Sequence, residues 1–201
     1  ISVTAGATYD SMTDVPTLTS ATVANYCVMN PNNASSSSVS VTSGNLDLSI
    51  AANATCAVST MAVTSGKWYW EFTAGTASQN AYYVSVCDVN NWSAPSKSQT
   101  DMYNSTYVWT YYGNNGNKIT NATATAYGSS FTSGDVIGVA LDMDAGTVVF
   151  YKNNTSQGTA FSVFAGKTIA PMIGNGASTT SSAGSINFGQ RPFSYTPPTG
   201  F

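Results

Sequence analysis

Residues 135–153, DVIGVALDMDAGTVVFYKN, decide how this chain folds. In the first half, Ile137, Val139 and Leu141 alternate with small or apolar neighbours; an Asp-Ala-Gly turn then leads into a returning segment at 147–152. Apolar residues at a period of two, reversed by a short segment with Asp and Gly, are typical of a β-hairpin. Because both faces of the first strand are small or apolar, we expect it to lie in the middle of a sheet that packs against a second sheet.

A second stretch with this period carries the largest side chains. Residues 67–73, KWYWEFT, place Trp68, Trp70 and Phe72 on one face. Since each large ring can bury about 150 to 250 Å², we expect all three to anchor the core between the two sheets. Residues 81–89, AYYVSVCDV, are predicted to form the neighbouring strand.

Further strand-like segments are spread along the chain and are bounded by turn residues. They are residues 25–30, ended by Pro31, and residues 39–42, 46–50, 56–64, 107–112, 169–174 and 185–188. No segment shows a period of 3.6 over a useful length, so we expect essentially no helix. Roughly ten to thirteen short strands joined by Gly, Asn and Ser turns predict an all-β fold, a two-sheet antiparallel β-sandwich.

The length of 201 residues suits one such sandwich with a single core. Residues 1–24 are rich in Thr, Ser and Ala, and we interpret them as an extended lead-in or linker that packs on a domain at residues 25–201. The chain starts at Ile1 rather than at Met, which suggests a piece of something longer.

Composition narrows the possible partners. Only 7% of the residues are charged, so Ser, Thr, Asn and Gly supply the polar surface, as is common in secreted and virion-surface β proteins. Six Lys and Arg residues with a net charge of -3 form no basic stripe, which argues against nucleic acid and anionic membranes as partners. No apolar run approaches the roughly 18 to 20 residues that membrane insertion requires.

The cysteine and histidine counts limit the chemistry. Cys27, Cys56 and Cys87 cannot all pair, so we expect buried thiols, with one Cys27–Cys56 disulfide as the alternative. Histidine is absent, which removes the commonest metal ligand and the commonest general base.

Several motifs, taken in order, resemble the SPRY domain family. They are SGKWYWEF at residues 65–72, GDVIGVALD at 134–142, VFYKN at 149–153, IAP at 169–171 and INFG at 186–189. Their order and separations match the family from about residue 25 to residue 196. The resemblance implies a concanavalin A-like jelly roll that acts as a binding module with its specificity in the loops.

A narrower likeness concerns four other segments. Residues 10–17, 25–31, 43–50 and 193–201 are similar to segments that flank SPRY modules in bacteriophage tail fibres and other virion proteins. With the composition, this likeness favours a non-catalytic module of a phage tail fibre or receptor-binding protein. Such a module would be extracellular, on the virion, would attach to a host surface glycan or protein and would contact other virion subunits, possibly as a homotrimer. Two alternatives stay open: a structural decoration or assembly domain of the virion, and a SPRY protein-interaction module of a cellular protein.

We do not expect catalysis, a cofactor or a bound metal. Related jelly rolls include glycosidases, which need two carboxylates about 5 to 10 Å apart, but the only Glu is Glu71, for which we predict a structural hydrogen-bonding role. Asp142 and Asp144 could chelate calcium; the favoured interpretation is that they shape the hairpin turn. Without His, no activated nucleophile is evident.

The aromatic and polar segment at residues 90–112 is the predicted ligand-binding surface. Its rings could stack on sugars or fill pockets, while its amides and carboxylates orient hydroxyl groups. The predicted ligand-binding residues are Asn91, Trp92, Lys97, Asp101, Tyr103 and Tyr107. Trp109 shares a period of two with Tyr107 and Tyr111, so we expect it to be a strand residue.

Overall fold

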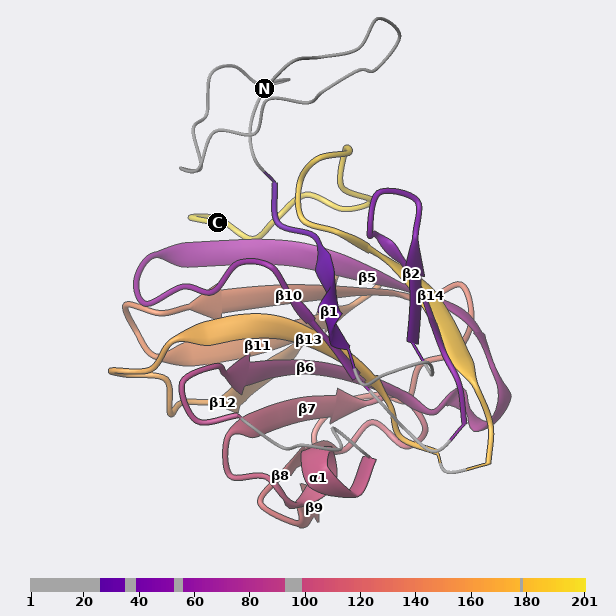
Figure 1. Cartoon of the computed structure of the whole chain (residues 1–201). Helices are drawn as coiled ribbons and strands as arrows, with labels where there is room; N and C mark the ends of the chain where they lie inside the picture. The colour runs from indigo at the N-terminus through magenta and orange to yellow at the C-terminus, as the bar shows by residue number, and fades with distance from the viewer. Residues whose placement is uncertain (1–25, 35–38, 53–55, 93–98, 178) are drawn as a thin grey trace, which may run out of the picture.

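The chain folds as a sandwich of two antiparallel sheets (Figure 1). The structure is a computed structural model that describes residues 26–34, 39–52, 56–92, 99–177 and 179–201. Within these residues there are fourteen strands, seven in each sheet, which confirms the predicted all-β sandwich. The lead-in predicted for residues 1–24 lies outside the described residues.

The strands are as follows, in their spatial order across each sheet. The first sheet contains β1 (Met29–Ala34), β4 (Cys56–Ser59), β13 (Ile169–Asn175), β6 (Tyr82–Asp88), β7 (Val108–Tyr112), β8 (Lys118–Thr120) and β9 (Thr123–Thr125). The second contains β12 (Thr155–Phe161), β11 (Thr147–Lys152), β10 (Val136–Asp142), β5 (Lys67–Ala77), β14 (Ser182–Asn187), β3 (Asp47–Ile50) and β2 (Val39–Thr42). Two short helical segments, η2 (Ser78–Asn80) and α1 (Gln99–Asn104), complete the described elements.

The hairpin β10–β11 lies where the sequence predicts it. β10 pairs with β11 on one side and with β5 on the other, so it is a central strand. Ile137, Val139 and Leu141 are fully buried on its inner face. On its outer face Gly138 lies under the ring of Tyr69, and a Cβ at this glycine would come within 2.5 Å of the Tyr69 hydroxyl oxygen. The Tyr69 ring therefore packs so close to the backbone of β10 that position 138 requires a glycine.

The tryptophan strand β5 differs from the prediction at its first ring. Trp70 and Phe72 are 2% and 1% exposed and do anchor the core, whereas Trp68 is 47% exposed. Trp68 pairs with Leu141 and is the second residue of β5, at the beginning of the strand. The expectation that all three rings are buried is therefore wrong for Trp68.

Strand pairing corrects two further predictions. β6 lies in the sheet opposite β5, between β13 and β7, so it is not a neighbour of β5. β1 does not end at Pro31 but runs through it. A proline is tolerated there because β1 is an edge strand with an irregular register against β4.

Short elements in polar sequence were not predicted. α1 falls in the aromatic and polar segment at residues 90–112. β8 is only three residues long, and β9 and β12 are mostly exposed and contain Thr or Gly, so all three show little apolar alternation. Their strand geometry comes from pairing with a neighbour, which sequence periodicity does not record.

Glu71 holds the C-terminal segment against the outer face of β5. The Glu71 side chain is buried, and its two carboxylate oxygens accept hydrogen bonds from the backbone N–H groups of Ser194 (2.7 Å) and Tyr195 (2.9 Å). The Tyr69 hydroxyl donates to the same carboxylate at 3.2 Å, and the ring of Phe193 meets Tyr69 edge-on at 5.0 Å. These contacts confirm the structural role predicted for Glu71.

The carboxylates at the two ends of the hairpin have backbone partners. Asp142 accepts hydrogen bonds from the N–H groups of Asp144 and Ala145, and Asp144 accepts one from Gly66 N–H at 2.7 Å. Asp142 and Asp144 therefore shape the hairpin turn, which is the favoured interpretation from the sequence.

At the other end, Asp135 is held by several groups. It pairs with Lys152 at 3.3 Å and accepts a hydrogen bond from Asn153. Burial alone would raise the pKa of Asp135, but the hydrogen bonds from Thr132 N–H, Asn153 and Lys152, and the charge of Lys152, lower it below its usual value.

The cysteines remain thiols, so the alternative Cys27–Cys56 disulfide is not formed. Cys56 and Cys87 are buried as expected, whereas Cys27 is only partly buried. In the described part of the chain, no helix is long and apolar enough to cross a membrane.

Candidate functional site

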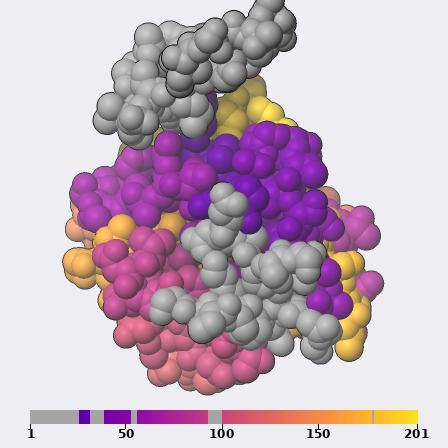
Figure 2. Space-filling model, in the orientation of Figure 1, coloured from indigo at the N-terminus to yellow at the C-terminus, as the bar shows by residue number. Residues whose placement is uncertain are grey.

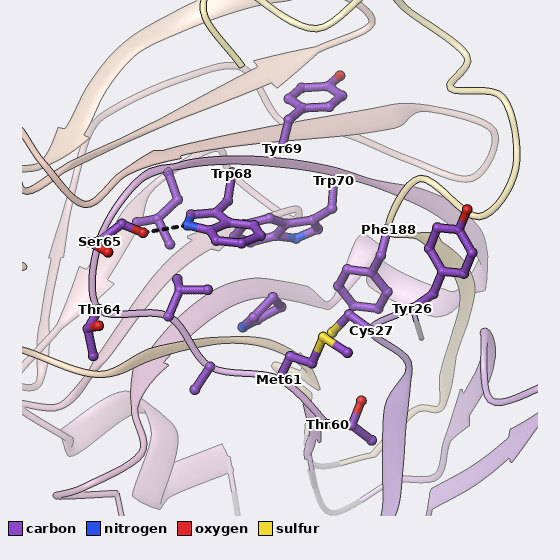
Figure 3. A pocket seen from close by; sticks show the side chains of 14 residues that line it. Tyr26, Cys27, Thr60, Met61, Thr64, Ser65, Trp68, Tyr69, Trp70 and Phe188 are labelled. Carbon is purple, nitrogen blue, oxygen red and sulfur yellow. Dashed lines mark hydrogen bonds between the residues drawn. The ribbon is translucent and has the colours of Figure 1, made fainter. Parts of the chain in front are cut away.

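A cavity with a volume of about 690 Å³ opens beside Trp68 (Figure 3), and we call it the Trp68 cleft. Its walls come from both sheets, from the loop between β4 and β5, and from the segments that precede β1 and follow β14. The residues that line it are Tyr26, Cys27, Thr60, Met61, Ala62, Val63, Thr64, Ser65, Trp68, Tyr69, Trp70, Leu141, Pro171 and Phe188. The size is that of cavities that hold small ligands or parts of a peptide.

Two indoles form one wall of the cleft. Trp68 and Trp70 lie side by side on the inner face of β5, while the side chain of Tyr69 lies on the other side of the strand (Figure 3). The indole N–H of Trp68 donates to the carbonyl of Ser65 at 2.7 Å, which holds the exposed ring in place. Trp70 Nε1 is buried and has no hydrogen-bond partner among the described residues.

The loop that forms the opposite wall, residues 60–66, is held at several points. Thr60 N–H donates to Val28 at 2.7 Å, and Val63 exchanges two backbone hydrogen bonds with Ile169 at 2.8 and 2.9 Å. At the far end, Gly66 bonds to Asp144 through its N–H and to Met143 through its carbonyl. Because these bonds fix both ends and the middle of the loop, the cleft is largely preformed.

The lining of the cleft is mainly apolar, with a few polar groups. Among the described residues that line the cleft there is no charged side chain; the polar groups are hydroxyls, indoles and one thiol. Burial raises the pKa of the Cys27 thiol above its ordinary value, so the nucleophilic thiolate is disfavoured. Apolar walls with a few polar groups are typical of a recognition site.

The predicted surface at residues 90–112 lies elsewhere. In Figure 1, α1 and strands β7 to β9 are at the bottom of the molecule, away from β5 and the C-terminus, and in Figure 2 the same residues form the lower end of the visible face. The sequence-based site and the Trp68 cleft are therefore separate regions.

The structure gathers part of the predicted surface around Asp88. Asn91 is exposed and donates to the Asp88 carboxylate at 2.8 Å, and Tyr107, 39% exposed, accepts a hydrogen bond from Asp88 N–H through its carbonyl. Trp92 and Tyr103 are half-buried and pack against a second apolar cluster that includes Met102 and Val108.

Two predicted residues remain. Asp101 is half-buried on α1, and Lys97 lies outside the described residues. No ligand contact has been tested for any of the six residues, so their role stays a prediction.

Sequence reasoning did not identify the Trp68 cleft. Its lining comes from positions as far apart as Tyr26 and Phe188, and most of these residues are common apolar or hydroxyl types. The one available signal was the pair Trp68 and Trp70, and a period of two assigns both to the core.

Comparisons with known proteins agree on the kind of domain. Residues 67–191 match the family described as the SPRY domain. The E3 ubiquitin-protein ligase RKP of Arabidopsis thaliana is 36% identical over 78 residues, which is 37% of this chain and 6% of that protein. The crystal structure of the SPRY domain of human HERC1 superimposes with a TM-score of 0.69 over 82% of this chain and 99% of that chain. Since its sequence identity is 24%, this likeness shows a shared fold.

Proposed function

We infer that this chain, which belongs to the SPRY domain family, is a non-catalytic protein-interaction module of a larger cellular protein, and that it binds a segment of its partner in the Trp68 cleft. The 78 matched residues make up only 6% of the plant ubiquitin ligase, which supports a module within a larger protein. By the same resemblance, recruitment of a protein to a ubiquitin ligase is one use of such a module.

The exposed indole of Trp68 carries this proposal. A large ring that is 47% exposed beside a preformed, mainly apolar cavity offers a partner apolar area to bury. Tryptophan is also among the residues that contribute most to binding energy at protein interfaces. The uncharged lining, with its one protonated thiol, offers no acid–base pair, which supports a role in binding alone.

Phage attachment is the more specific prediction from the sequence, and it has less support. Neither relative named above is a phage protein: one is from a plant and the other is human. They favour the cellular alternative over a tail fibre, a virion assembly domain or a host glycan as partner. The phage likeness of the flanking segments stays a prediction, and adsorption of the purified chain to bacterial surfaces tests it.

A peptide selection tests the proposed function. The full chain, Trp68→Ala and Tyr107→Ala are each screened against the same displayed library of random peptides. We expect the full chain and Tyr107→Ala to enrich the same sequences and Trp68→Ala to lose them. Enrichment that survives Trp68→Ala but is lost in Tyr107→Ala would move the binding site to the surface at residues 90–112, and a chain that enriches no peptide would contradict the proposal.

A further inference from the structure

We propose that the partner segment in the Trp68 cleft carries an arginine, which lies on the exposed indole of Trp68 and pairs with the carboxylate of Asp144 at the rim of the cleft. This inference rests on the proposed function and specifies the chemistry of the partner. Three observations carry it: a carboxylate without a positive partner, its place beside the exposed indole, and hydrogen-bond acceptors on the adjoining loop.

Asp144 is a carboxylate that the chain leaves without a positive partner. It lies in the turn between β10 and β11, and it is the only exposed acidic side chain among the described residues. Its Oδ1 accepts a hydrogen bond from Gly66 N–H at 2.7 Å, and its Oδ2 has no partner in the described part of the chain. Lys67, which follows Gly66, pairs with Asp142 at 3.1 Å instead. Because a carboxylate can accept about four hydrogen bonds, Asp144 keeps most of its capacity for a ligand.

Gly66 places this carboxylate next to the exposed indole. A Cβ at Gly66 would be 3.4 Å from Trp68 Nε1, so the backbone that binds Asp144 lies against the edge of the ring. On the same edge the indole N–H donates to the Ser65 carbonyl (Figure 3), which fixes a ring that is 47% exposed. A carboxylate beside an open aromatic face suits a guanidinium, which can accept the negative charge in an ion pair and stack on the ring at the same time.

The adjoining loop offers acceptors for the remaining N–H groups of an arginine. Thr64 and Ser65 are exposed and line the cleft, and neither their hydroxyls nor the Thr64 carbonyl has a hydrogen-bond partner among the described residues. A guanidinium has five N–H donors and no acceptor, so it fits a site that holds a carboxylate, hydroxyls and a carbonyl. Lysine is a compact charge that does not stack in this way. Arginine therefore matches the site better than lysine does.

The segment that precedes the cleft does not supply this arginine. Residues 1–25 lead directly into Tyr26, which lines the cleft, and they contain no Lys or Arg. The one arginine of the sequence, Arg191, donates to the Ile186 carbonyl at 3.4 Å. The arginine is therefore assigned to the partner, and the net charge of -3 favours the approach of a positive segment.

Titrations with defined peptides test the inference. The full chain, labelled with ¹⁵N, is titrated with the peptide Ala-Leu-Arg-Leu-Ala, blocked at both ends, and with matched peptides in which citrulline or lysine replaces the arginine. Citrulline has nearly the shape of arginine but no charge. We expect the arginine peptide to bind about tenfold more tightly than the citrulline peptide and to shift the resonances of the Trp68 indole N–H and the Gly66 amide. Equal binding of the citrulline peptide would overturn the need for a cation, and equal binding of the lysine peptide would overturn the choice of arginine.

Variants separate the ion pair from the stacking. Asp144→Asn keeps the Oδ1 acceptor for Gly66 and removes the charge, so it should weaken the arginine peptide about threefold and leave the citrulline peptide unchanged. Asp47→Asn, which removes the same charge on β3, should leave both unchanged, and Trp68→Ala should weaken both about tenfold or more. Added salt should weaken the arginine peptide in the unmodified chain and much less in Asp144→Asn. Thermal unfolding verifies the fold of each variant, and an Asp144→Asn chain that binds the arginine peptide as tightly as Asp47→Asn does would overturn the pairing.

The failure of this inference can be told from the failure of the proposed function. Peptides from the display selection that depend on Trp68, lack arginine and bind Asp144→Asn unchanged would overturn this inference and leave the proposed function intact. A synthetic peptide with the sequence of residues 1–25 enters the same titration, and tighter binding of it than of the arginine peptide would assign the cleft to the chain's own N-terminal segment and overturn both. Binding of the arginine peptide that is lost in Tyr107→Ala and kept in Trp68→Ala would also contradict both.

Discussion

Replacing Glu71 with Gln should loosen the C-terminal segment and destabilise the whole sandwich. The Glu71 carboxylate is 2% exposed and joins β5 to Ser194 and Tyr195, far away in the sequence, through two backbone hydrogen bonds. Glutamine has the same shape but keeps one acceptor oxygen and presents an NH₂ group in place of the other. One of the two backbone N–H groups then faces a donor.

The magnitude follows from these contacts. A backbone N–H left without its acceptor costs about 1 to 3 kcal/mol, and the remaining bond changes from charge-assisted to neutral, which removes about 1 kcal/mol more. Ser194 is exposed, so water can replace part of the loss at its N–H group. We therefore expect the free energy of unfolding to fall by about 2 kcal/mol, which lowers the Tm by about 4 to 8 °C in a domain of this size.

Urea unfolding at neutral pH measures the effect. Asp47→Asn on β3 is the control, since it removes the same charge and should change the free energy of unfolding by less than about 0.5 kcal/mol. In Glu71→Gln the C-terminal segment should also be cleaved by chymotrypsin after Phe193 or Tyr195 under conditions in which the unmodified chain is resistant. A Glu71→Gln variant as stable as the control, with the same resistance to cleavage, would refute the role of the carboxylate as the anchor.

Three further predictions concern the sandwich itself. Gly138→Ala should lower the free energy of unfolding by about 1 to 3 kcal/mol, because the added methyl group meets the Tyr69 hydroxyl, and a urea midpoint equal to that of the unmodified chain would contradict this. Because the pKa of Asp135 is lowered in the folded chain, its contribution to the free energy of unfolding is present above the pKa of an unfolded Asp, about 4, and is lost as the pH falls through the folded pKa. Asp135→Asn should therefore make the free energy of unfolding depend less on pH in the acid range. An unchanged pH dependence would argue against this. Trp68→Ala should cost less than about 1 kcal/mol, whereas Trp70→Ala should cost about 3 to 5 kcal/mol, and similar Tm losses in the two would show that Trp68 is part of the core.

The fold was largely predictable because its central strands carry strong local signals. The alternation of Ile137, Val139 and Leu141 and the Asp-Gly turn specify β10–β11 through residues close in sequence, and burial then confirms the pattern. β6 was assigned correctly as a strand, but its neighbours were not, because pairing with β13 depends on contacts between distant segments. Period-two patterns identify strands and faces but do not specify which sheet a strand joins.

The candidate site was less predictable for the same reason. Trp68 is exposed although it shares the period of two with the buried Trp70 and Phe72, so the local pattern holds no sign of its exposure. The unpartnered nitrogen of Trp70 likewise depends on the groups that the fold brings around it. The segment at residues 90–112 was predicted as a binding surface from its composition, but in the structure Trp92 and Tyr103 are partly buried and pack against the second apolar cluster.

Hydrogen exchange of the full chain, with and without the tightest peptide from the display selection, tests the central claim most directly. The account predicts that bound peptide slows exchange of the backbone amides at residues 60–70 and leaves those at residues 99–107 unchanged. Slower exchange at residues 99–107, with none at residues 60–70, would contradict it.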